Sequence, residues 1–189
     1  MCPIRRLFLV VASCLISLSS AWAVPALELV NQVSSTTYTG FLNDALYTHT
    51  GDNRGISGAQ HDLARTNIVN SFQTYNLQPV LDPFTYSGST YYNVVGTIPG
   101  CLHPEQYYIV GAHYDSVNNP GADDNGSGTA GVLELARVFS QYAFESSVLF
   151  IAFDREEQGL VGSNAHPAAF HPLPMLNIGP TRFTIHAVM

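Results

Sequence analysis

Histidine and carboxylate side chains gather in the middle of the sequence, and their types suit the binding of divalent metal ions. His113 and Asp115 stand two residues apart, Asp124 follows in a glycine-rich stretch, and the pair Glu156-Glu157 comes later. Imidazole and carboxylate groups are zinc ligands, and one carboxylate can bridge two ions about 3.5–4 Å apart. Carboxylates that converge repel one another unless a cation lies among them, so the clustering is a first indication of metal.

Each cluster taken alone has an ordinary explanation. Asp115 could accept the second N–H of His113 and orient its ring, because residues two apart in an extended segment point the same way. A loop histidine is nevertheless usually just solvated. The glycine-rich stretch around Asp124 also fits a helix N-cap turn. Only the combination favours a metal site.

The adjacent glutamates could divide the work of hydrolysis. Neighbouring residues point in different directions, so one glutamate could bind a metal ion while the other faces the substrate. The second carboxylate could take a proton from water and pass it to a leaving amine. A lone Glu-Glu pair, by contrast, is most often a solvated surface feature.

Two apolar strands are predicted directly before these clusters. Residues 106–112 and 147–153 read as strands, and residues 128–142 between them form an amphipathic helix. Strand, loop, helix and strand make a βαβ unit, whose strands should be parallel. Open α/β sheets bind ligands at the carboxyl ends of their strands, which is where both polar clusters fall.

The elements that precede this unit are helical and then extended. Residues 24–50 and 59–75 predict helices separated by a turn at 51–57, and strands at 78–86 and 90–98 flank a turn at Ser87-Gly88-Ser89. The second helix should bury one apolar side, formed by Leu63, Ile68, Val69 and Phe72.

Length, charge and cysteines narrow the class of protein. The 189 residues suit one domain, and a net charge of −7 with no lysine argues against nucleic acid as a partner. Residues 1–23 read as a secretory signal peptide, with Arg5 and Arg6 before an apolar run and Ala21-Trp22-Ala23 as the cleavage site. We therefore expect a secreted chain that lacks a membrane span after processing. Cys101, which lies outside this signal, is expected to be a buried free thiol.

Three segments together resemble the co-catalytic zinc aminopeptidases of metallopeptidase family 28, which also includes glutamate carboxypeptidase-like enzymes. The segments match in order and spacing, and they are residues 111–116 (GAHYDS), 121–128 (GADDNGSG) and 153–163 (FDREEQGLVGS). The resemblance implies an α/β fold, a three-layer α/β/α sandwich around a mixed, largely parallel sheet. It also implies two zinc ions and peptide substrates.

The roles implied by the resemblance can be assigned residue by residue. His113 would bind one zinc, Asp124 rather than Asp123 would bridge both ions, and Glu157 would bind the other. Glu156 would be the general base and Asp115 would orient His113. The peptide after the bridging aspartate can be cis in the family, so the Asp124-Asn125 bond is a candidate.

The sequence departs from the family pattern after about Ser163. The family supplies two further ligands downstream, an aspartate and a histidine, yet no Asp or Glu follows Glu157. Residues 164–189 carry four prolines and read as a divergent, poorly ordered tail, leaving residues 24–163 as the first part of the peptidase domain. The sheet should then be incomplete on its C-terminal side, with an exposed edge.

These departures leave three readings open. The first is a secreted zinc aminopeptidase that hydrolyses peptides by a two-metal activated water, impaired in this chain because each zinc would keep only two protein ligands. The second is a non-catalytic fragment or binding protein of the same family. The third is a two-metal hydrolase of acylated amines. Substrate side-chain preference and oligomeric state are not readable from the residues.

Overall fold

The computed structural model describes residues 26–46, 53–55, 59–169 and 185–188. The chain divides into two units, residues 1–31 and 32–189. In the first unit, residues 26–31 belong to helix α2 (Ala26–Gln32); the sheet and the remaining helices belong to the second unit. The predicted signal peptide, and residues 170–184 of the predicted tail, lie outside the described residues. No described helix is both long and apolar enough to cross a bilayer.

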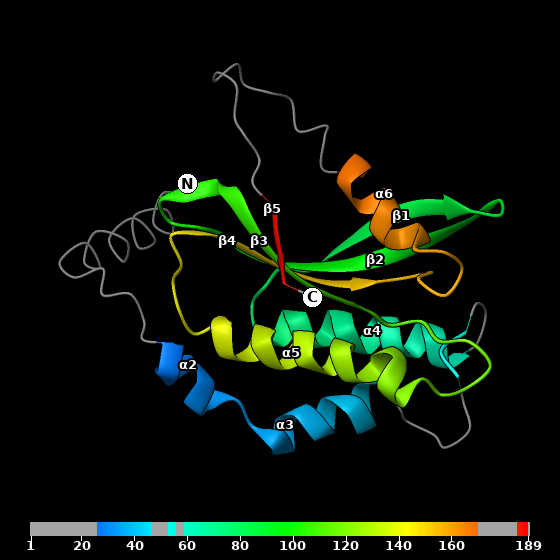
Figure 1. The fold of residues 1–189 in the computed structure, drawn as a ribbon, viewed down its shortest axis with the longest axis horizontal. Helices are drawn as coiled ribbons and strands as arrows, with labels where there is room; N and C mark the ends of the chain where they lie inside the picture. The colour runs from blue at the N-terminus through cyan, green and yellow to red at the C-terminus, as the bar shows by residue number, and fades with distance from the viewer. Residues whose placement is uncertain (1–25, 47–52, 56–58, 170–184, 189) are drawn as a thin grey trace, which may run out of the picture. The chain divides into compact units, whose positions relative to one another are not determined.

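The centre of the second unit is a mixed sheet with strand order β1-β2-β4-β3-β5 (Figure 1). Its strands are β1 (Val80–Tyr86), β2 (Ser89–Ile98), β3 (His103–His113), β4 (Ser146–Phe153) and β5 (Ile185–Val188). The pairs β1–β2 and β2–β4 are antiparallel, whereas β4–β3 and β3–β5 are parallel. The predicted parallel pair of the βαβ unit is therefore confirmed.

The hairpin between β1 and β2 turns where the sequence predicts. Ser87 and Gly88 both have positive φ, 49° and 79°, as a two-residue hairpin turn requires. Pro83 has no backbone N–H to donate. It is tolerated in β1 because β1 is an edge strand of the sheet.

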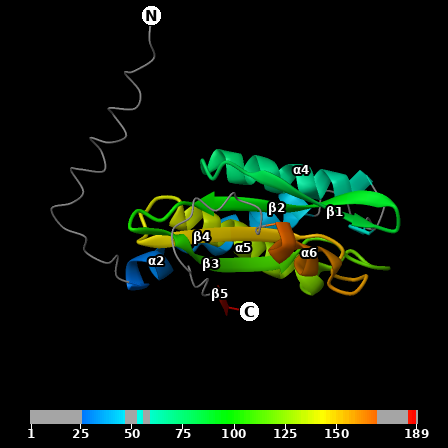
Figure 2. The same ribbon diagram turned by 90° about the horizontal axis from the view of Figure 1, so that it is seen from above.

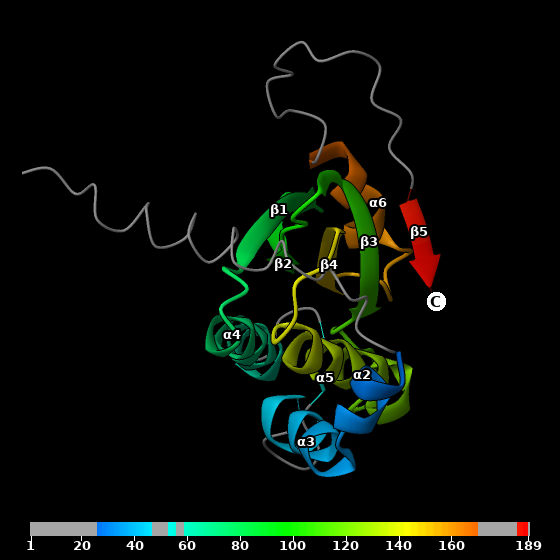
Figure 3. The same cartoon turned by 90° about the vertical axis from the view of Figure 1, so that its left-hand side faces the viewer.

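Helices cover both faces of the sheet and make the predicted α/β/α layers. Helices α4 (Ala59–Thr74) and α5 (Gly128–Phe139) lie on one face and α6 (Val161–Ala169) on the other, as Figure 1 and Figure 2 show. Helix α3 (Ser35–Gly40) and the π-helical turn η2 (Phe41–Leu46) lie beyond α5, away from the sheet (Figure 3).

The main core lies between the sheet and α4 and α5. Ile68 and Phe72 of α4 meet Leu133 of α5 and Val94 and Phe150 of the sheet, and all are fully buried. Leu63 is wrongly predicted to face this core. It is 37% exposed, because the buried side of α4 runs through Ala64, Ile68 and Phe72 instead, at helical spacing.

Three further expectations concern the thiol, the sheet edge and the tail. Cys101 is exposed rather than buried, because it lies in the turn between β2 and β3. On the predicted open side of the sheet, Tyr107–Val110 of β3 pair with the short strand β5, which is the last strand in the described order. The expected domain boundary at Ser163 falls inside α6.

Candidate metal centre

Strands β3 and β4 end side by side, and this brings the two sequence clusters to one edge of the sheet. His113, the last residue of β3, lies opposite Phe153, the last residue of β4. The backbone N–H of Tyr114 also donates to the carbonyl of Phe153, 2.9 Å away. The loops that follow the strands therefore begin at the same place, as expected for a parallel pair.

His113 is buried and contacts a carboxylate through each of its ring nitrogens. Its Nε2 lies 3.0 Å from Oδ1 of Asp124 and 3.7 Å from Oε2 of Glu156. Its Nδ1 lies 3.4 Å from Oδ1 of Asp115, and Thr129 donates a hydrogen bond to its carbonyl. Burial lowers the pKa of His113, but the carboxylates of Asp115 and Glu156 outweigh burial and leave that pKa raised.

Asp115 has no exposed surface and joins the two loops. Its Oδ1 and Oδ2 accept the backbone N–H groups of Glu156 and Glu157 at 3.1 and 3.2 Å. Burial raises the pKa of Asp115, yet the hydrogen bonds from His113 and from these two N–H groups prevail and hold it below its ordinary value. Asp115 therefore orients the glutamate pair as well as His113, a contact that the sequence pattern does not suggest.

Asp124 reaches the centre from a break in a helical turn. Turn η3 (Ala122–Ser127) is interrupted at Asp124, whose φ of −105° and ψ of 99° are extended. The peptide bond between Asp124 and Asn125 is cis, which confirms that expectation. The side chain of Asp124 is 77% exposed, so its carboxylate is accessible to a ligand from solvent.

The two glutamates add negative charge to the same place. The pKa of Glu157 is raised, first by partial burial and then by repulsion from the carboxylates of Asp124, Asp115 and Glu156, with His113 opposing. The side chain of Glu156 is 34% exposed. All five residues singled out from the sequence thus lie within electrostatic reach of one another, and their excess negative charge favours a cation.

The described donors fit zinc in kind but not in number. Imidazole and carboxylate are suitable ligands, and the pair His113–Asp124 is held at contact distance. Within residues 26–46, 53–55, 59–169 and 185–188, however, no three His, Cys, Asp or Glu side chains are arranged to hold one ion. These residues therefore offer a partial coordination sphere.

Arg54 is a contributor that the sequence pattern missed. It is fully buried, and its guanidinium donates to the carbonyls of Tyr114, Pro120 and Gly121 at 2.7, 2.6 and 2.8 Å. It thereby fixes both ends of the segment that leads from His113 to Asp124. A single arginine inside a predicted turn belongs to no periodic pattern or motif. Its role in holding this segment is therefore recognisable only from its burial in the structure.

A second missed pair lies beneath the strand ends. Nε2 of His61, on α4, is 2.9 Å from Oδ1 of the fully buried Asp154. The ring of His61 stacks on Tyr114 with centroids 5.1 Å apart. Because Tyr114 stands between His113 and Asp115, the stack supports the backbone of both.

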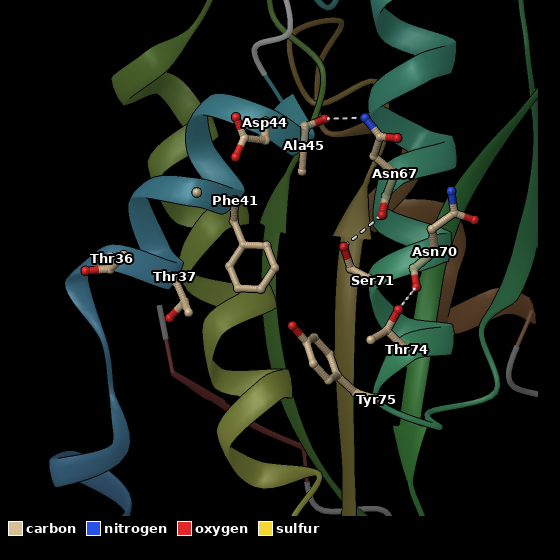
Figure 4. A pocket seen from close by; sticks show the side chains of 11 residues that line it. Thr36, Thr37, Phe41, Asp44, Ala45, Asn67, Asn70, Ser71, Thr74 and Tyr75 are labelled. Atoms are coloured by element: carbon tan, nitrogen blue, oxygen red, sulfur yellow. Dashed lines mark hydrogen bonds between the residues drawn. The ribbon is translucent and has the colours of Figure 1, made fainter.

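A cavity of about 550 Å³ lies elsewhere, between α3, η2 and α4. Figure 4 shows Phe41 and Tyr75 facing one another across it, with Asn70, Ser71 and Thr74 along α4. The five residues of the candidate centre are absent from its lining. The cavity therefore shares no lining residue with the candidate centre.

Part of the chain matches a known protein family. Residues 93–179 match the description of peptidase family M28. Over these residues the chain belongs to peptidase family M28. A probable zinc metalloprotease of Pyrenophora tritici-repentis is 46% identical over 79 residues, which are 37% of this chain and 18% of that protein. Aminopeptidase YwaD of Bacillus subtilis is 44% identical over 82 residues, covering 42% and 18%.

Solved structures place the M28 chain in the same fold. The LapA aminopeptidase of Legionella pneumophila superposes with a TM-score of 0.63 at 22% identity, over 76% of this chain and 40% of LapA. A glutaminyl cyclase from an Acidobacteriales bacterium gives 0.63 at 19% identity, over 74% and 53%. The chain thus spans only part of the length of each relative. The match to the family extends beyond Ser163, to residue 179.

Proposed function

We propose that this polypeptide belongs to a secreted zinc-dependent exopeptidase of the aminopeptidase type. The convergence of His113, Asp124 and Glu156 at the ends of β3 and β4, with Asp115 tying the loops together, supports this most directly. Aminopeptidase is part of the names of YwaD and LapA. Secretion rests on the signal-like pattern of residues 1–23.

The roles proposed for the five residues follow from their positions. His113 and Glu157 would each hold one of two zinc ions, and Asp124, whose side chain is exposed, would be the ligand that both ions share. Asp115 engages Nδ1 of His113, so Nε2, which faces Asp124, is the ring nitrogen that would bind a metal. Zinc, when bound, supplies a Lewis acid that acidifies water and polarises a peptide carbonyl.

Glu156 is proposed as the general base. Its backbone is fixed by Asp115, while its carboxylate points toward His113 and remains partly exposed. A peptide substrate can therefore approach the carboxylate from solvent. Glu156 would accept a proton from water and deliver it to the departing amine.

We further propose that the described residues alone bind zinc weakly and hydrolyse peptides poorly. Two protein ligands for each ion are fewer than the three usual at a catalytic zinc, and no three-ligand group is formed by the described residues. The same deficit supports the second candidate function, a non-catalytic peptide-binding member of the family.

Zinc titration calorimetry combined with hydrolysis of an aminoacyl anilide tests these proposals. The expected result is weak zinc binding that Asp124→Asn weakens by about tenfold or more, and slow zinc-dependent hydrolysis that Glu156→Gln abolishes without changing zinc affinity. Glu105→Gln, an exposed glutamate of β3, is the matched control and should change neither. Tight stoichiometric zinc with rapid turnover would refute the impairment. Zinc binding with no hydrolysis would favour the non-catalytic candidate.

A further inference from the structure

Asn93 is a fully buried amide in the apolar strand β2, outside the three segments that resemble the family. It lies opposite Asp82 of β1. The next residue of β2, Val94, pairs with Ala152 of β4, close to where β4 ends. The Asn93 side chain therefore stands beside the start of the segment that carries Glu156 and Glu157, residues 154–162, hereafter the glutamate loop.

The amide of Asn93 holds both ends of the glutamate loop. Its Oδ1 accepts the backbone N–H of Asp154 at 3.0 Å, and its Nδ2 donates to the carbonyl of Gly162 at 3.0 Å. One side chain thus bridges the first residue of the loop and a residue of the first turn of α6. Buried hydrogen bonds of this kind are costly to lose, because the backbone groups left behind have no water to replace the partner.

The base of the loop is closed by further contacts at the same place. Gly162 donates to the carbonyl of Asp154 at 3.1 Å, and Val161 donates to that of Arg155 at 3.0 Å. A Cβ added at Gly162 would collide with the carbonyl oxygen of Asp154 and with Oδ1 of Asn93. The position therefore admits little beyond glycine while the Asn93 contacts are in place.

The orientation of the Asn93 amide is fixed by its surroundings. Nδ2 also lies 3.2 Å from Oδ2 of Asp82, which His166 of α6 contacts through Nδ1 at 2.8 Å. A carboxylate and a carbonyl on one side require the NH₂ group, and the N–H of Asp154 on the other requires the oxygen. An aspartate at position 93 would instead set its carboxylate against Asp82 and the Gly162 carbonyl.

We propose that Asn93 is a positioning residue for the reaction, which clamps the ends of the glutamate loop and so aims Glu156 and Glu157 at the metal centre. Through this clamp the N–H groups of both glutamates meet the carboxylate of Asp115. The link to catalysis rests on the proposed peptidase function, whereas the clamp itself is a property of the folded chain.

Amide hydrogen exchange of the metal-free chain, followed residue by residue by NMR, tests the clamp without requiring activity. In Asn93→Asp, the amides of Glu156, Glu157, Val161 and Gly162 should exchange about tenfold faster or more. Those of β4 and α5 should remain close to wild type. Asn93→Ala removes the amide without adding charge and gives the same test if the aspartate variant folds poorly.

Asn67→Asp is the matched control. The amide of Asn67, on α4, donates to the carbonyl of Ala45 at 3.0 Å, far from the glutamate loop in sequence and outside the contacts of the clamp. This variant should leave exchange in residues 154–162 unchanged. Unchanged exchange in both Asn93 variants, or an equal acceleration of all amides, would overturn the clamp.

Zinc titration of the same variants tests the link to the metal centre. Asn93→Ala should weaken zinc binding by about tenfold, as loss of groups that support ligands generally does, and Asn67→Asp should not. If the amides of the glutamate loop exchanged faster in the Asn93 variants but zinc affinity did not change, the clamp would stand and the positioning role would be overturned. A wild-type chain that binds no zinc would defeat the proposed function and leave the exchange result to decide the clamp.

Discussion

The two loops that build the candidate centre are held in different ways. The first, residues 114–121, is fixed by the guanidinium of Arg54, a charged donor that reaches three carbonyls. The second, the glutamate loop, is fixed by the neutral amide of Asn93, one donor group and one acceptor on a neighbouring strand. In both loops, a buried side chain outside the set of candidate metal ligands holds the backbone at the loop ends.

The difference predicts where each loop is vulnerable. A buried guanidinium concentrates the stability of the first loop in one residue, since hydrogen bonds to charged groups are stronger than neutral ones. The glutamate loop is stabilised by several contacts, which come from Asn93, from Asp115 and from the close packing at Gly162. Single changes there should cost less, and should act locally.

Arg54→Ala should have the largest effect. It leaves the carbonyls of Tyr114, Pro120 and Gly121 buried without this donor, and we expect the free energy of unfolding to fall by about 3–5 kcal/mol. Urea denaturation followed by circular dichroism measures the loss. Arg65→Ala removes a salt bridge to the exposed Asp62 and a contact with the Tyr92 ring, so it should cost less, about 1–2 kcal/mol. Equal losses in the two variants would contradict the role of Arg54.

Asp115→Asn should come next, because Asp115 belongs to both loops. The amide would keep one acceptor but turn an NH₂ group toward the N–H donors of Glu156, Glu157 or His113. We expect a loss of about 2–3 kcal/mol by the same denaturation measurement. Asp123→Asn, an exposed neighbour of the bridging candidate, should be neutral. If Asp115→Asn left the free energy of unfolding unchanged, Asp115 would not be what joins the two loops.

Gly162→Ala should disturb only the glutamate loop. The added methyl meets the carbonyl of Asp154 and the amide of Asn93, so we expect a loss of about 1–2 kcal/mol. The control is Gly131→Ala in α5, where an added Cβ meets nothing within 4 Å. There alanine should be neutral or stabilise by about 0.5–1 kcal/mol. Thermal unfolding should therefore show a lowered midpoint for Gly162→Ala and an unchanged or raised midpoint for Gly131→Ala.

The pH dependence of stability should sharpen the role of Asp115 further. In the metal-free chain the pKa of His113 is raised above 6.5. Its contribution is therefore complete below that pH and is lost as pH rises through the raised pKa. The pKa of Asp115 is lowered from 3.8, so its contribution is present above that value and is lost as pH falls through the lowered pKa. NMR titration of His113 should show its pKa fall in Asp115→Asn, and an unmoved pKa would contradict this coupling.

Asp124→Asn should have the smallest effect on stability and a large one on metal. Its exposed side chain makes one described contact, to His113, so we expect a change within about 0.5 kcal/mol. Zinc affinity should fall by about tenfold or more. Calorimetry and urea denaturation on the same sample provide both measurements. A strongly destabilised variant would show that Asp124 supports the first loop.

The sequence predicted those parts of the centre that depend on local pattern. The strands predicted at 106–112 and 147–153, the hairpin at Ser87-Gly88 and the helix starting at Gly128 follow from hydrophobic periodicity and turn residues. All are observed, although β3 begins at His103 and includes His113. The convergence of both clusters follows from parallel pairing. Leu63 was wrongly assigned to the buried side of α4. Periodicity predicts that a helix has a buried side, but which residues form it depends on the neighbours that the helix packs against.

The supporting residues could not be predicted in the same way. Arg54 and Asn93 act on backbone 60 to 69 residues away in sequence, and neither belongs to a repeating pattern or a motif. An asparagine in an apolar strand is a weak signal of a buried hydrogen bond. Its partners become identifiable only when the sheet order puts β2 beside β4.

Cys101 lies at a position suited to labelling the protein for distance measurements. The thiol is exposed at the turn that precedes β3, and the candidate centre begins where β3 ends. At about 3.3 Å per residue, the 11 residues of β3 set the two roughly 35 Å apart. A fluorophore or spin label attached there would lie too far away to disturb zinc, yet near enough for distance measurements to a paramagnetic ion at the centre.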